Sequence, residues 1–143
     1  LDAHSRIKIP ATELVGSFFD TTYSYRFAAP QHEVTVATIT DIETGKYLAD
    51  AFHFPMGRKA AFFDAQLKAN VVKTEAGFAL DIETDRFAQS VEINADGLLP
   101  SDNWFHLAPG MVRRIELIGD VSGGADPMRL EAHVSGTRIR ISR

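Results

Sequence analysis

Apolar and polar side chains alternate along much of residues 77–118, and this period of two constrains the fold more than any other feature. Phe78, Leu80 and Ile82 alternate with small or acidic residues, and Ile115 and Leu117 repeat the pattern further along the chain. Such alternation is typical of a β-strand that buries one face and exposes the other. The sequence therefore predicts strands that pack one face onto a shared core.

Turn signals cut the rest of the chain into short segments of the same kind. The turns at 41–46, 74–77, 94–97 and 108–110 contain the Gly, Asn, Asp and Pro residues that tight reversals need. A loop is predicted over 121–127 and a turn over 135–137. The predicted strands lie at 14–19, 23–27, 34–39, 48–54, 67–71, 78–82, 87–93, 104–107, 115–117, 130–134 and 139–141. The predicted fold class is therefore all-β, a sandwich of two antiparallel sheets.

The length of 143 residues fits one hydrophobic core. We expect a tail or first edge strand over residues 1–12 and a single β-sandwich domain over residues 13–143. The loop at 55–59 is the best internal seam, although it is too short for a domain linker. The chain begins without Met or a signal pattern, so we interpret it as a piece of a longer protein.

Charge and composition restrict the partners. The net charge of −4 argues against nucleic acid, because nucleic-acid-binding domains carry a clustered excess of Lys and Arg. No apolar run approaches the ~20 residues of a membrane helix. The chain contains no Cys, which excludes disulfides and thiolate sites. We predict no nucleic-acid or membrane partner and no cofactor, and the compartment stays open.

The sequence gives only weak evidence for catalytic or metal-binding groups. Asp81, Glu83 and Asp85 share one strand face, but such neighbours lie about 6.6–7 Å apart, whereas calcium ligands converge to about 2.3–2.6 Å from the ion. We therefore predict a solvated acidic face and no metal site. The histidines lack metal-binding spacing, the serines lack a nucleophile elbow, and nothing brings together two acids for glycoside hydrolysis.

Trp104 is the only tryptophan and the one candidate ligand-binding residue. With Tyr47 or Tyr23 it could form an aromatic platform on which a sugar ring stacks. The alternative places it in the core or at an interdomain contact. We favour the alternative, because tryptophan is usually largely buried and because Phe105 and Leu107 need the same core.

The most specific motif of the chain is Pro100–Gly110, which contains Ser-Asp-Asn-Trp-Phe followed by Pro-Gly, and Phe87–Val91 precedes it. These segments resemble the C-terminal β-sandwich domain of β-mannosidases in glycoside hydrolase family 2. Gly16–Phe27 and Ala51–Pro55 resemble the upstream half of that domain. The resemblance covers most of residues 13–142 and implies an immunoglobulin-like β-sandwich.

The family resemblance implies a longer parent enzyme that also has a (β/α)8 barrel with two catalytic glutamates. This chain contains no part of the barrel, so no catalytic residue is assigned to it. Our first hypothesis is therefore a non-catalytic structural domain from the C-terminal part of such an enzyme, with its other domains as partners. The alternative is an autonomous carbohydrate-binding module that uses Trp104, and a weaker third option is an adhesion sandwich unrelated to sugars.

Overall fold

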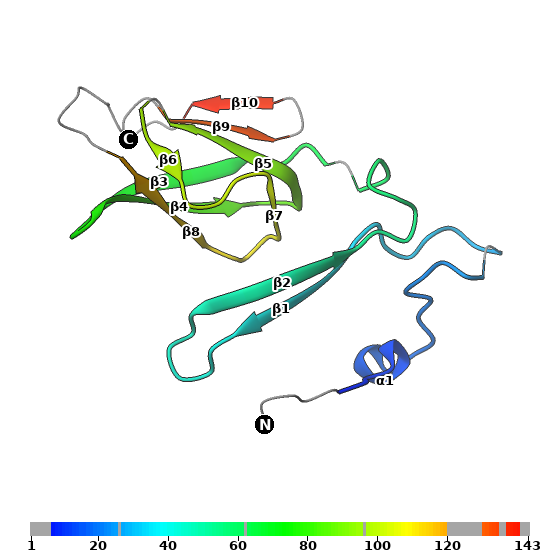
Figure 1. The fold of residues 1–143 in the computed structure, drawn as a ribbon. Helices are drawn as coiled ribbons and strands as arrows, with labels where there is room; N and C mark the ends of the chain where they lie inside the picture. Colours follow the sequence, from blue (N-terminus) through cyan, green and yellow to red (C-terminus); the bar gives the residue numbers. More distant parts are fainter. Residues whose placement is uncertain are drawn as a thin grey trace. The chain divides into compact units, whose positions relative to one another are not determined.

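The structure is a computed structural model that describes residues 7–25, 27–61, 63–95, 97–119, 130–134 and 137–140, the last two ranges by their backbone. The chain forms two compact units, Leu1–Ala61 and Phe62–Arg143. Its regular structure is almost entirely β, as Figure 1 shows. Among the described residues, no helix has the length and apolar character needed to cross a membrane.

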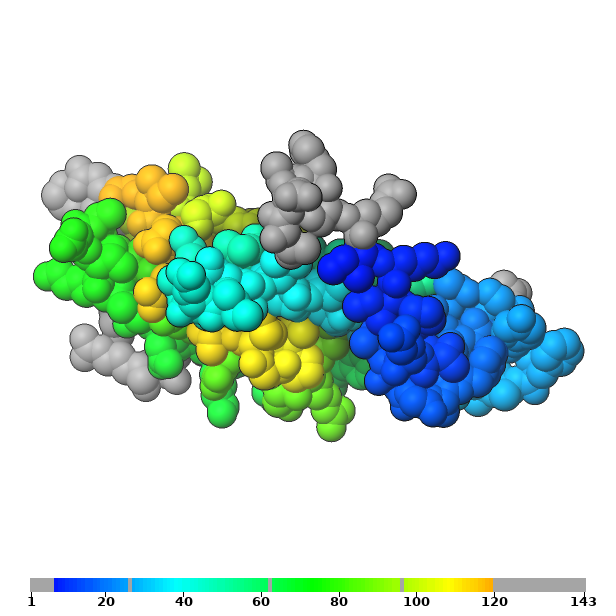
Figure 2. Space-filling view, turned by 90° about the horizontal axis from the view of Figure 1, so that it is seen from below, coloured from blue at the N-terminus to red at the C-terminus, as the bar shows by residue number. Residues whose placement is uncertain are grey.

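The first unit contains one short helix and one hairpin. The helix is α1 (Ala11–Val15), and the hairpin pairs β1 (Thr35–Thr40) with β2 (Tyr47–His53) in antiparallel fashion. The Asp41 carboxylate accepts hydrogen bonds from the Glu43 and Thr44 backbone N–H groups and from the Thr44 hydroxyl, which holds the connection. The predicted hairpin is confirmed, and Figure 2 shows the surface of one of its faces in cyan.

The strand predicted at 14–19 is wrong, because this region begins with helix α1. Pro10 occupies the N-cap, where its fixed φ and missing N–H cost nothing, and the Glu13 N–H donates to the Pro10 carbonyl at 3.0 Å. Gly16 ends the helix with a φ of 73°, and its N–H donates to the Thr12 carbonyl. These local caps determine the helix, whereas the spacing of the apolar residues is compatible with either a helix or a strand.

The strand predicted at 23–27 is also wrong over its described residues, 23–25 and 27. The Asp20 carboxylate accepts the N–H of Ser24 at 3.0 Å and that of Tyr25 at 2.7 Å. These bonds fold the chain back on itself and place Tyr23 at a φ of 51°, outside the β region. The bond from the Tyr25 N–H is the main reason that the pKa of Asp20 lies below its usual value. The alternation of aromatic residues here therefore belongs to a side-chain-capped loop.

The second unit is a sandwich of two four-stranded antiparallel sheets, which appear as two layers in Figure 1. The first sheet has the order β3-β4-β8-β6 and the second has the order β10-β9-β5-β7. The strands are β3 (Leu67–Thr74), β4 (Gly77–Thr84), β5 (Ala88–Ala95), β6 (Leu99–Pro100), β7 (Phe105–Leu107), β8 (Arg113–Ile118), β9 (Leu130–Val134) and β10 (Thr137–Arg140). The predicted all-β sandwich of two antiparallel sheets is confirmed, whereas the predicted extent of its domain, 13–143, stays a prediction.

The core lies between these two sheets and is built by the alternation that the sequence shows. The largest fully buried side chains are Leu80, Ile82 and Ile115 from one sheet and Val91 from the other. Leu80 is the register partner of Ile115, so neighbouring strands bury the same face. The strands predicted at 67–71, 78–82 and 115–117 are thus confirmed together with their inward faces.

Strand β5 contains a bulge that the sequence pattern did not predict. Ala88 pairs with Leu107 and Val91 pairs with Phe105, so β5 carries one residue more than β7 over this interval. Within it, Ser90 has a φ of 55°, and its N–H donates to Nδ1 of His106 at 3.0 Å. The bulge explains why Ala88 and Val91 are both buried although they lie an odd number of residues apart.

The remaining predictions concern turns and the last strands. Gly110 has a φ of 76°, as the predicted type II turn at 108–110 requires. The strand at 130–134 is confirmed as β9, which pairs with β5. The loop predicted over 121–127, residues 135 and 136 of the predicted turn, and residue 141 of the last strand lie outside the described residues.

Candidate functional site

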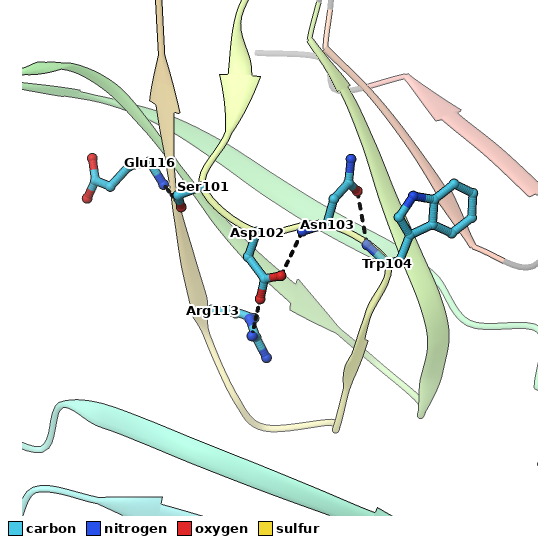
Figure 3. Close-up of polar contacts among 6 residues, drawn as sticks. All are labelled: Ser101, Asp102, Asn103, Trp104, Arg113 and Glu116. Atoms are coloured by element: carbon cyan, nitrogen blue, oxygen red, sulfur yellow. Dashed lines mark hydrogen bonds and ion pairs between the residues drawn. The ribbon is translucent and has the colours of Figure 1, made fainter.

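The segment Ser101–Trp104, here called the crossing loop, carries the most specific sequence motif and joins the two sheets. It runs from β6, which pairs with β8, to β7, which pairs with β5. Because β6 and β7 belong to different sheets, the crossing loop passes from one layer of the sandwich to the other (Figure 3). Its polar side chains therefore lie where they can bind both layers.

The first half of the crossing loop is attached to β8. The Ser101 N–H donates to the Glu116 carbonyl at 2.8 Å, and the Glu116 N–H donates to Ser101 Oγ at 3.0 Å. Next to it, Asp102 Oδ2 accepts a hydrogen bond from Arg113 Nη2, while Asp102 Oδ1 accepts the N–H of Asn103. These contacts come from the side opposite the Trp104 indole in Figure 3. They extend the pairing of β6 with β8 beyond the two residues of β6.

The second half of the crossing loop is attached to β5 through Asn103. Asn103 Oδ1 accepts the N–H of Ile93 at 2.7 Å, and Asn103 Nδ2 donates to the Ile93 carbonyl at 3.0 Å. The side-chain amide thus replaces the strand partner that Ile93 would otherwise lack on this edge. The same Oδ1 accepts the Trp104 N–H at 3.1 Å. Asn103 therefore binds the edge of one sheet while Ser101 and Asp102 bind the other.

Arg113 contacts both Asp102 in the crossing loop and Phe105 in β7. Its guanidinium carbon lies 4.5 Å from the centre of the Phe105 ring, and its side chain is only 15% exposed. A cation held over an aromatic face and paired with a carboxylate retains favourable interactions as water is removed. The motif Ser-Asp-Asn-Trp-Phe thus works with Arg113 as one structural cluster.

Trp104 is exposed, so the placement in the core is wrong, while the other half of that alternative, an interdomain contact, stays a prediction. Its side chain is 61% exposed and its backbone φ is 61°. Phe105 and Leu107 point inward in strand β7, and alternation leaves Trp104 on the outside. Tyr47 on β2 and Tyr23 both belong to the first unit, and a platform shared with Trp104 stays a prediction.

The three carboxylates singled out in the sequence each have a different partner. Asp81 accepts hydrogen bonds from Nε and Nη2 of Arg114 at 2.7 and 2.6 Å. Glu83 lies 3.8 Å from the Lys68 amine, and Asp85 accepts the Gln66 N–H. Within the described part of the chain, no group of three histidine or acidic side chains could hold a metal ion.

Without the Asp81 carboxyl, the folded protein should lose less stability in acid than the wild type does. The hydrogen bonds from Arg114 hold the pKa of the Asp81 carboxyl below its usual value, although partial burial opposes them. Because the unfolded pKa is about 3.9, the stability that this group contributes is complete above that pH and is lost as the pH falls through the folded value.

Urea unfolding at about pH 6 and about pH 3 measures this effect. Asp81→Asn should lose less stability between the two pH values than the wild type does. Arg114→Gln removes the same pair from its other side and should flatten the pH dependence in the same direction. A loss that is identical in all three proteins would contradict the assignment.

His32 and His106 have structural contacts. His32 Nε2 lies 2.9 Å from the Thr35 hydroxyl, and its ring packs on Phe19. His106 binds the bulge at Ser90, and its ring lies 5.7 Å from that of Phe87. His4 and the side chain of His133 lie outside the described residues.

An open hollow of about 520 Å³ lies between the end of β5 and β6, beside the crossing loop. Sequence reasoning missed it, because its walls come from two strands of different sheets. Its lining includes buried residues, such as Ile93 and Leu98, and the exposed Leu99. The main lining residues are Ile93, Asn94, Leu98, Leu99, Pro100 and Asn103.

Comparison with known proteins identifies the family. No curated protein matches the chain. A family model described as an Ig-fold domain, Ig_mannosidase, matches residues 62–140, which is more than half of the 143 residues. The matched range begins where the second unit begins and contains every strand of the sandwich. The chain therefore belongs to the family of immunoglobulin-fold domains of mannosidases.

Proposed function

We propose that this chain is a non-catalytic sandwich domain of a retaining glycoside hydrolase of family 2 that acts on β-mannosides. In this role it packs on the other domains of the enzyme, which are its partners. The mannosidase association of the family supports this proposal, and so does the resemblance carried by the crossing loop. The reaction itself belongs to another domain of the parent enzyme.

The observation that carries the non-catalytic role is that Asp102 and Asp81 are each paired with an arginine. A retaining glycosidase needs two carboxyl groups about 5–5.5 Å apart on either side of a bound sugar. In this chain Asp102 is paired with Arg113, and Asp81 is held by two hydrogen bonds from Arg114. These two carboxylates are thus engaged in joining strands.

An assay on an aryl β-mannoside tests the proposal. We expect no release of the aryl group above that of buffer, while a complete family 2 β-mannosidase serves as the positive control. Turnover that rises in proportion to the concentration of the purified chain would contradict the proposal. An Asp102→Asn variant then decides whether the crossing loop is responsible for that turnover.

A second candidate function is an autonomous carbohydrate-binding module. The exposure of Trp104 favours it, because an aromatic ring outside the core is free to stack on the apolar face of a sugar. Titration calorimetry with mannan and manno-oligosaccharides tests this function. Measurable heat from the intact chain supports it, and the absence of heat rejects it.

A further inference from the structure

We infer that the Trp104 indole and the hollow between β5 and β6 together form one subsite for a neutral sugar ring of a manno-oligosaccharide. The inference rests on the second candidate function and gives that function a location. Asn103 connects the two parts, because it lines the hollow and is followed directly by Trp104. Figure 3 shows these two side chains next to each other at the end of the crossing loop.

The backbone of Trp104 is fixed before any ligand binds. Its N–H donates to Asn103 Oδ1, and the same amide is bound at both ends to Ile93 in the sheet. A positive φ in a bulky residue is unfavourable by itself and persists only where the surroundings enforce it. The crossing loop thus presents an exposed aromatic side chain from a rigid support, which lowers the entropy cost of stacking.

The hollow lined by Asn103, the residue before Trp104, has room for a sugar ring and polar groups to bind it. Its volume of about 520 Å³ lies within the usual range of ligand sites. The amide side chains of Asn94 and Asn103 line it, and amides can exchange hydrogen bonds with the hydroxyl groups of a neutral sugar. Leu99, which is 72% exposed, and Pro100 offer apolar surface, while Asn94 adds an exposed amide that can donate and accept hydrogen bonds.

Intrinsic fluorescence tests this site directly, because Trp104 is the only tryptophan in the chain. Mannotetraose is titrated to about 10 mM, well above the ~1 mM Kd of weak specific binding. We expect a saturable change in emission and protection of the indole from acrylamide. Maltotetraose is titrated in parallel to compare a different sugar geometry.

Three variants locate the site by calorimetry. Trp104→Asn should weaken binding by about tenfold or more, and because Asn adopts positive φ readily, its unfolding transition should stay close to that of the wild type. Asn94→Ala should weaken binding by a few-fold. Ile118→Ala removes a side chain that is exposed on β8 and does not line the hollow, and it should bind like the wild type.

Two results would overturn the inference. One is the lack of any fluorescence change and any heat with all sugars, which would show that the indole and the hollow bind none of them. The other is binding that Trp104→Asn leaves unchanged, which places the sugar elsewhere on the chain. Neither result bears on the proposed non-catalytic role, which fails only if the chain turns over the aryl β-mannoside.

Discussion

Leu80→Ala should lower the free energy of unfolding by about 2–5 kcal/mol. Leu80 is completely buried and sits in register with Val71 on one side and Ile115 on the other, at the centre of the first sheet. Its side chain belongs to the core that both sheets share. Truncation removes favourable burial and leaves a cavity that neighbouring strands fill only in part, because their positions are fixed by backbone hydrogen bonds.

Leu99→Ala provides the matched control for this prediction. The chemical change is the same, but Leu99 is 72% exposed on the short strand β6, so the cost should stay within about 0.5 kcal/mol. Urea unfolding followed by circular dichroism compares the two variants, with the midpoint as the readout. Similar losses in both would show that the two sheets do not enclose Leu80 in a common core.

The sandwich was largely predictable because its strongest signals are local. The alternation at Phe78, Leu80 and Ile82 determines both the strand and the face that it buries. The turn at 74–77 lies between two such patterns and predicts the β3–β4 hairpin, whose register ends at Thr74 and Gly77. In these segments, propensity, alternation and turn chemistry all favour the same structure.

The first unit was harder to predict because single polar contacts decide its structure. The carboxylate of Asp20 captures two backbone N–H groups that a strand would need, and a period of two cannot reveal this. The signal was nevertheless present, since Asp followed by two Thr residues is typical of side-chain-capped turns. Pro10 and Gly16, at either end of α1, likewise indicate a short helix once they are considered together.

The motif that contains the crossing loop was identified from the sequence, but the binding of this loop to both sheets was not predicted. Ser101 binds Glu116 and Asn103 binds Ile93, and each pair is separated by ten residues or more. Local patterns carry no information about such pairs. The exposure of Trp104, by contrast, could have been predicted, because inward-facing Phe105 and Leu107 leave the position before them on the outer face.

Asn103→Ala should lower the free energy of unfolding by about 2–3 kcal/mol, which is more than any other single change in the crossing loop. Its amide satisfies the N–H and the carbonyl of Ile93, a residue that is only 2% exposed, and the N–H of Trp104. Alanine leaves the N–H and the carbonyl of the buried Ile93 without their partner, and each of these two groups carries a desolvation cost. The crossing loop would also lose its side-chain hydrogen bonds to β5.

Amide hydrogen exchange separates this explanation from a general loss of packing. In Asn103→Ala, the amides of Ile93 and Trp104 should lose protection by more than the global decrease in stability accounts for. Asn103→Asp keeps an oxygen that can accept both N–H groups but loses the donor to the Ile93 carbonyl, so it should protect these amides better than alanine does. Asn70→Ala, at an exposed position on β3, should change neither stability nor exchange beyond about 0.5 kcal/mol. If Asn103→Ala resembles Asn70→Ala in both measurements, the crossing loop does not hold the sheets together, because its central hydrogen bonds would then contribute nothing to the folded state.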